Sequence, residues 1–150
     1  MSMFSAFNIN ASGLTSQRYR MDVISENVAN ANTTRTEDGT PYRRKVVTFA
    51  QKGDQTSFSR VLGNVSLYHG YSGQGVKVDG VYEDTETEMN MVYDPSHPDA
   101  DENGYVTYPN VNIITEMTNL IDASRAYEAN ATAFNASKSM ALQGLQLTQQ

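Results

Sequence analysis

Both ends of the chain repeat apolar residues at alternating steps of three and four, and this pattern constrains the fold more than any other feature. So narrow a stripe of apolar residues is buried only against another helix. The pattern therefore predicts two long terminal helices that pair as a coiled coil in a protein that functions by association. We call these residues the apolar seam: Phe7, Leu14, Met21, Ile24, Val28, Ile113, Met117, Leu120, Tyr127, Phe134 and Leu145.

A polar middle rich in turn residues separates the two helical patterns. We expect the first helix over residues 3–31, followed by Asn and Thr residues that disfavour its continuation. The second helix is expected from Asn110 to about Leu147, with Asn110 or Asn112 as its N-cap. The predicted organisation has four parts: residues 1–32 as the N-terminal helix of a core domain, 33–93 as a small β-rich middle domain, 94–110 as an extended connector, and 111–150 as the C-terminal helix of the core domain.

The middle region carries several short strand patterns. Residues 42–50 are rich in β-branched and aromatic side chains, and residues 61–68 give a weaker signal of the same kind. Val76, Val78 and Val81 predict a further strand, with which Met89 to Tyr93 is expected to pair. Residues 94–109 contain three prolines, so they predict an irregular connector rich in Pro and Asp. The expected fold class is α+β.

Charge is unevenly distributed along the chain, whose net charge is −6. Eleven acidic residues and no Lys or Arg lie between Lys77 and Arg125, so nucleic acid is not an expected partner. The one basic cluster, residues 43–45, is interpreted as a solvated face, with a charged subunit contact as the alternative. There is no cysteine, which excludes disulfides and thiolate chemistry.

Neither a cleaved signal peptide nor a transmembrane segment is predicted. The first 30 residues lack a charged start followed by an apolar run. No stretch approaches 18 consecutive apolar residues.

The acidic loop after the prolines is the best candidate for a ligand site. Residues 99–104 follow the start of a calcium loop, D-x-D-x-N-G, but the twelfth position is Asn110 instead of a bidentate Glu. Pro95 and Pro98 also exclude an entering helix, so an Asx turn is the preferred interpretation. A zinc site at His69 or His97 would need further ligands, for which Asp94, Asp99 and Asp101 are the only obvious candidates, so a turn is the preferred interpretation here too. No nucleophile or phosphate-loop motif is present, so we predict no metal, no cofactor and no catalysis.

Two segments carry a family resemblance. Residues 24–33, ISENVANANT, closely resemble the N-terminal signature of the bacterial flagellar rod and hook proteins, whose kernel N-x-A-N-x-x-T is matched by Asn27, Ala29, Asn30 and Thr33. Residues 93–106, YDPSHPDADENGYV, with Asp94, Pro95 and Pro98, are similar to a proximal rod member of that family, as is RAYEAN at residues 125–130.

The resemblance implies a structural subunit of the basal-body rod. Such subunits assemble helically with copies of themselves and with other rod proteins, and their paired terminal helices surround the export channel of a motile flagellum. It also implies contacts with basal-body ring and export components, a location across the periplasm, and type III export without a cleaved signal peptide. The alternatives are another axial protein, such as a distal rod or hook subunit, or a coiled-coil binding module with a calcium-like acidic loop.

Overall fold

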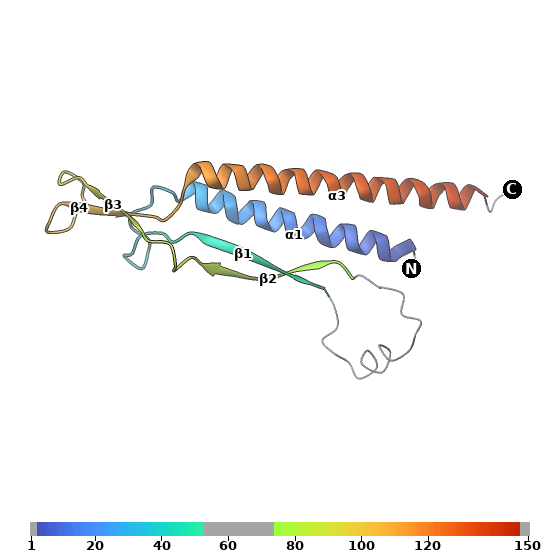
Figure 1. Cartoon of the computed structure of the whole chain (residues 1–150), viewed down its shortest axis with the longest axis horizontal. Coiled ribbons are helices and arrows are strands. Elements are labelled where there is room, and N and C mark those ends of the chain that lie inside the picture. Colours follow the sequence, from blue (N-terminus) through green and yellow to red (C-terminus); the bar gives the residue numbers. More distant parts are fainter. Residues whose placement is uncertain (1–2, 53–73, 148–150) are drawn as a thin grey trace, which may run out of the picture.

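Two long antiparallel helices dominate the computed structural model, which describes residues 3–52 and 74–147 (Figure 1). α1 (Met3–Ala29) has 27 residues and α3 (Ile113–Leu147) has 35. At 1.5 Å per residue they are about 40 Å and about 52 Å long. Both predicted helices are confirmed, with α1 ending two residues earlier than expected. They lie side by side, and both chain termini lie at the same end of the molecule (Figure 1).

Asparagines cap the C-terminal end of α1 and the N-terminal end of α3. The Asn30 side chain donates to the Glu26 carbonyl at 3.0 Å and accepts the Thr33 hydroxyl at 3.1 Å, which closes α1. Asn112 Oδ1 accepts the backbone N–H groups of Ile114 and Thr115 at 3.0 and 3.2 Å. Of the two predicted N-caps, Asn112 is therefore the one that caps α3.

A two-stranded antiparallel sheet packs along α1. It consists of β1 (Lys45–Gln51) and β2 (Val76–Glu83), with an irregularity between Thr48 and Phe49. The Val76 N–H donates to the Ser12 hydroxyl oxygen at 3.1 Å, which fixes the start of β2 on the helix. Strands at 42–50 and around Val76–Val81 were predicted, and both are confirmed. The predicted strand at 61–68 lies outside the described residues.

The second sheet corrects two predictions. β3 (Asn90–Tyr93) pairs with β4 (Tyr105–Tyr108), although Met89–Tyr93 was expected to pair with β2 and residues 94–109 were expected to be irregular throughout. β2 ends in a tight turn in which Asp84 Oδ1 accepts the N–H of Thr87 at 3.0 Å, and the chain then leaves the first sheet. The prolines at 95 and 98 lie in the loop of the new hairpin instead of interrupting its strands.

The apolar core is small and lies where the end of α1 meets the start of α3. Ala31, Tyr42 and Val111 form a buried cluster there. Val23 and Ile24 of α1 and Ala123 of α3 are buried as well. Over the two described ranges, the helices lack the combination of length and hydropathy that crossing a bilayer requires. A network of polar contacts lies beside this cluster, because the Tyr42 hydroxyl donates to Asn27.

Candidate functional site

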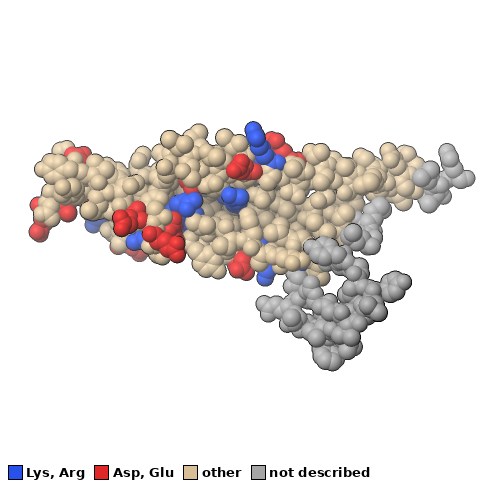
Figure 2. All heavy atoms as spheres, viewed as in Figure 1, with Lys and Arg blue, Asp and Glu red and all other residues tan. Residues whose placement is uncertain are grey.

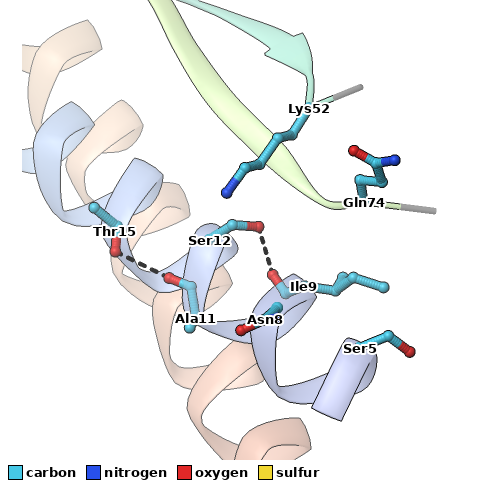
Figure 3. A pocket seen from close by; sticks show the side chains of 8 residues that line it. All are labelled: Ser5, Asn8, Ile9, Ala11, Ser12, Thr15, Lys52 and Gln74. Carbon is cyan, nitrogen blue, oxygen red and sulfur yellow. Dashed lines mark hydrogen bonds between the residues drawn. The ribbon is translucent and has the colours of Figure 1, made fainter. Parts of the chain in front are cut away.

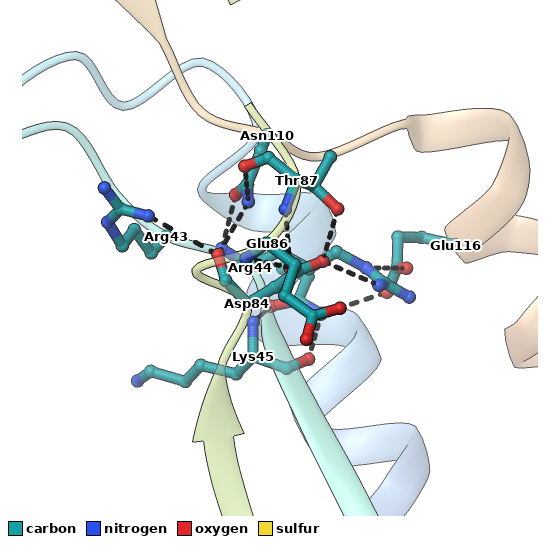
Figure 4. Close-up of polar contacts among 9 residues, drawn as sticks. Arg43, Arg44, Lys45, Asp84, Glu86, Thr87, Asn110 and Glu116 are labelled. Atoms are coloured by element: carbon teal, nitrogen blue, oxygen red, sulfur yellow. Dashed lines mark hydrogen bonds and ion pairs between the residues drawn. The ribbon is translucent and has the colours of Figure 1, made fainter. Parts of the chain in front are cut away.

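A network of hydrogen bonds, which we call the polar junction, joins α1, β1, β2 and α3 at one point (Figure 4). Its members are Asn27, Tyr42, Arg44, Asp84, Asn110 and Glu116. Asn27 is almost completely buried and uses its whole side-chain amide. Its Oδ1 accepts the Tyr42 hydroxyl and the Lys45 N–H, each at 2.9 Å. Its Nδ2 donates to the Lys45 carbonyl at 2.9 Å and to Glu116 Oε2 at 3.0 Å.

Arg44 lies between two carboxylates from opposite sides of the junction. Its Nε donates to Glu116 Oε1 at 2.8 Å, and its Nη1 pairs with Asp84 Oδ2 at 3.4 Å (Figure 4). Glu116 is 1% exposed, so both of its oxygens are desolvated and both are satisfied, one by Arg44 and one by Asn27. Because a buried charge needs such partners, the first turn of α3 is fixed against both β1 and α1.

Asn110 and Asp84 complete the junction from the other side. Asn110 Oδ1 accepts the Arg44 N–H at 2.9 Å, and its Nδ2 donates to the carbonyls of Asp84 and Thr87. The N–H and hydroxyl of Thr87 both donate to the Asp84 carboxylate, and these bonds are the main reason that its pKa is lowered. Glu86 and Arg44 add smaller contributions in the same direction.

Tyr42 has a strongly shifted phenol. Burial, followed by the nearby Glu26, Glu116 and Glu83 carboxylates, raises the pKa of Tyr42 to about 12. The phenol therefore stays protonated and keeps donating to Asn27 at physiological pH. The buried hydroxyl therefore helps to hold the polar junction together.

The basic cluster at residues 43–45 is only in part what the sequence predicted. Arg44 is an internal ion-pair partner, so the interpretation of the whole cluster as a solvated face is wrong for this residue. Lys45 pairs with Glu26 across the α1–β1 contact. Three consecutive basic residues in a chain with an excess of acids indicate that ion pairs will form. The sequence does not show which acidic residues are the partners.

The polar groups of the junction are hydrogen-bonded to one another, an arrangement that holds elements together. A surface hollow of about 540 Å³ lies elsewhere, between the N-terminal half of α1 and the ends of β1 and β2 (Figure 3). Among the described residues its lining holds Ser12, Thr15 and Lys52 but no carboxylate or imidazole. The two hydroxyls donate to helix carbonyls, Ser12 to Ile9 and Thr15 to Ala11 (Figure 3). Among the described residues, no group of three or more His, Cys, Asp or Glu side chains is placed to hold a metal.

The acidic loop at residues 99–104 forms hydrogen-bonded turns. Asp101 Oδ1 accepts the N–H groups of Asn103 and Tyr105 at 2.9 and 2.8 Å, and Gly104 has a φ of 83°. Asp99 Oδ2 accepts the Thr34 hydroxyl at 2.8 Å, and Asp99 also pairs with Arg35. These bonds occupy oxygens that a calcium ion would need, so the geometry favours the Asx turn.

The residues of the apolar seam are more buried in α1 than in α3. Its α1 members are buried or half-buried, and the Phe7 ring packs edge-on against Phe134 with centroids 5.1 Å apart. In α3, Leu120 and Phe134 are half-buried, whereas Ile113, Met117, Tyr127 and Leu145 are exposed. The surface of α3 that meets α1 is mainly small or polar: Glu116, Ala123, Asn130 and Ala141. A Cβ at Gly13 would lie 2.7 Å from Asn130 Oδ1, which shows how closely the helices approach there.

Comparisons with known proteins match the two helical ends. The family model described as "Flagella basal body rod protein" matches residues 7–35, which include α1 and Asn27. The model described as "Flagellar basal body rod FlgEFG protein C-terminal" matches residues 102–147, which include Asn110, Glu116 and α3. A flagellar basal-body rod protein FlgC from Bacillus subtilis is 46% identical over 98% of this chain and 99% of its own length. The chain belongs to the FlgC family of flagellar basal-body rod proteins.

More distant members of the FlgC family agree over the same length. The protein from Borreliella burgdorferi is 45% identical and that from Salmonella typhimurium 40% identical, each over 99% of this chain. These proteins are named as rod components, and neither matching family model describes an enzyme. The chain is thus a structural flagellar basal-body rod subunit.

Most of the residues that carried the family resemblance form hydrogen bonds in turns or in the polar junction. Asn27 is central to the polar junction, and Asn30 and Thr33 close α1, while Ala29 is exposed on the last turn. Asp94 Oδ1 accepts the hydroxyl and the N–H of Ser96, and these bonds lower its pKa. Pro95 and the exposed Pro98 lie in the same loop, and Pro95 packs near Gly104. The motif therefore builds turns and the junction, while Arg44, Asp84 and Glu116 were missed because only the folded chain brings them together.

Proposed function

We propose that this rod subunit belongs to the proximal rod and assembles helically with copies of itself and other rod proteins into the shaft that surrounds the export channel. In this proposal residues 1–32 and 111–150 form the core domain as a coiled coil, and residues 33–93 form a middle domain outside it. The connector of residues 94–110 joins the two. The assembled rod supports flagellum-dependent motility.

One observation carries the proposal: α3 exposes a long apolar face on the side turned away from α1. Ile114 is 78% exposed, and Met117 and Ile121, one and two turns along the same face, are 55% and 53% exposed. A contiguous apolar surface of this kind marks a contact with another protein, because leaving it in water is unfavourable. Helices of neighbouring subunits would cover it.

The proposed partners and location follow from the family. Other rod proteins are the expected axial neighbours, and basal-body ring and export components are the expected contacts at the base. The location is the rod within the periplasm, reached by type III export without a cleaved signal peptide. The alternative within the same family is a distal rod or hook position.

Imaging of purified basal bodies tests the proposal. The full chain with a small internal epitope replaces the native subunit, and antibody-labelled particles are examined by electron microscopy. We expect label on the rod between the membrane ring and the hook, and none in particles from cells that carry the untagged chain. Label on the hook would support the alternative, and unlabelled rods in motile cells would contradict the proposal.

A further inference from the structure

One basic residue lies on the buried face of α1. Arg20 follows the buried Ser16 by four residues and precedes the buried Val23 and Asn27 by three and seven. This spacing places all four side chains on one side of the helix, and Arg20 is itself half-buried there. Lys and Arg are seldom buried in proteins unless an acidic group pairs with them. The position of Arg20 therefore calls for a counter-charge.

The described residues supply no such counter-charge. Over the ranges 3–52 and 74–147, no carboxylate forms an ion pair with the Arg20 guanidinium. Glu116, an acid that lines the same surface hollow, already uses one oxygen on Arg44 and the other on Asn27. Leaving a cation partly desolvated without a partner is unfavourable, so this position favours an anion from outside the chain.

Arg20 lines a hollow of about 260 Å³ where α1, β1 and α3 meet. We call it the Arg20 groove, and its residues include Arg20, Val23, Ile24, Val47, Phe49 and Asn119. Asn119, from α3, is half-buried, and its amide forms no hydrogen bond to any described residue. One guanidinium and one free amide beside aliphatic and aromatic side chains suit a carboxylate on a short apolar stem. The hollow is smaller than a typical pocket for a drug-sized molecule, so it has room for a side chain.

The exposed apolar face of α3 carries such a carboxylate. Ile114, Ile121 and Glu128 are each seven residues apart, so they lie on one side of the helix, and all three are exposed. No described basic residue pairs with Glu128. The chain has 17 acidic and 11 basic residues, and Figure 2 shows acidic clusters on its surface. A second copy therefore offers a carboxylate next to apolar side chains, which matches the Arg20 groove in charge and in polarity.

We propose that the Arg20 groove is a carboxylate site, which receives Glu128 from the exposed α3 face of a second copy. The Arg20 guanidinium then gains its missing counter-charge, and the Asn119 amide donates to the same carboxylate. The groove and the α3 face are different surfaces, so the contact is heterologous and runs sideways from one copy to the next. The inference rests on the proposed assembly of copies and specifies one lateral contact within it.

The isolated chain gives the first test. Arg20→Gln removes a charge that has no partner in the described part of the chain, so the urea midpoint of the monomer should stay the same or rise. Arg44→Gln is the comparison, because Arg44 pairs with Glu116 and Asp84, and its loss should lower the midpoint. A fall of similar size for Arg20→Gln would mean that an acid of the same chain holds Arg20, and it would overturn the proposal.

A charge exchange in cells tests the partner. Arg20→Glu and Glu128→Arg are made in the full chain, separately and together, and the chain in purified basal bodies is measured by immunoblot. Each single change brings like charges together in the groove, so we expect the amount of chain in basal bodies to fall by about tenfold or more. The double variant restores an opposite pair and should recover most of the wild-type amount and of swimming. No loss in either single variant, or no recovery in the double variant, would overturn the proposal.

Matched variants separate this pair from general effects of charge. Arg18→Glu makes the same change two residues away on the exposed side of α1, and it should leave incorporation unchanged. Asp122→Arg reverses an acid at another exposed position of α3, and it should not rescue Arg20→Glu. Rescue by Asp122→Arg equal to that by Glu128→Arg would overturn the proposal, because the effect would then be one of net charge. If the wild-type chain is itself absent from rods, the proposed function fails; if it is present and Arg20→Glu is incorporated normally, only this contact fails.

Discussion

At the scale of single residues, Glu116 has the least freedom to change. Its carboxylate is 1% exposed and holds both Arg44 and Asn27. Glu116→Gln keeps the shape but leaves the Arg44 guanidinium without that buried counter-charge. We expect a loss of about 2 kcal/mol in the free energy of unfolding, measured by urea denaturation of the full chain. Glu88→Gln makes the same chemical change at an exposed site and should stay within about 0.5 kcal/mol of the wild type. Equal effects of the two changes would contradict a structural role for the junction.

Tyr42 gives the junction a pH dependence at the alkaline end. Its pKa is about 12 in the folded chain and 10.0 for an ordinary tyrosine, so between these values the unfolded chain loses a phenol proton that the folded chain keeps. Its contribution to stability is therefore complete below pH 10 and is lost as the pH rises toward 12, by on the order of 2 kcal/mol. Urea denaturation across this range should show a steeper decline for the wild type than for Tyr42→Phe. Parallel pH profiles would contradict the assignment to Tyr42.

At the scale of elements, Gly75 controls how β2 meets α1. It has a φ of 93°, and a Cβ there would lie 2.2 Å from the Ser12 Oγ that accepts the Val76 N–H. Gly75→Ala should therefore cost about 2–3 kcal/mol, from backbone strain together with displacement of the strand. Gly39→Ala is the matched control, because Gly39 has a φ of 77° but nothing within 4 Å of the added Cβ, and it should cost only about 1 kcal/mol. The stability of each variant is measured from its urea midpoint. If Gly75→Ala destabilised the chain no more than Gly39→Ala, the contact with Ser12 would be refuted.

The elements also show how far the sequence leads. Helix periodicity and Asn caps are local properties, so α1 and α3 followed from the sequence, and their ends followed to within about three residues. The strand that pairs with β3 could not be predicted in this way, because a four-residue strand can pair with β2 or with β4 about equally well. The turn at Asp84 decides between them. The junction was missed for a related reason. Arg44 and Glu116 are 72 residues apart, and no periodic pattern links an ion pair at that separation.

At the scale of the whole molecule, the two faces of α3 differ: one packs on α1, and the other carries the exposed apolar side chains that we propose for assembly. Apart from Leu120 and Phe134, the side of α3 that meets α1 is small or polar, whereas Ile114, Met117 and Ile121 are exposed on the side turned away from it. A seam read from the sequence shows which positions are apolar, but it does not show which of them are covered within one chain. The molecule is accordingly better described as one element of a larger assembly than as a complete globular unit.

This division predicts a variant that folds normally and fails to assemble. Ile114→Asp places a charge on a side chain that is 78% exposed, so the urea midpoint of the isolated chain should change little. In the assembled rod the same carboxylate would be buried without a partner, at a cost of several kcal/mol, and incorporation into basal bodies should be lost. Ala133→Asp adds the same charge at an exposed position about 100° away around α3, so it should be tolerated better. Swimming assays and immunoblots of purified basal bodies measure the outcome. Normal motility of the Ile114→Asp strain would mean that this face of α3 stays in water in the rod, and the α3 contact proposed for assembly would have to be abandoned.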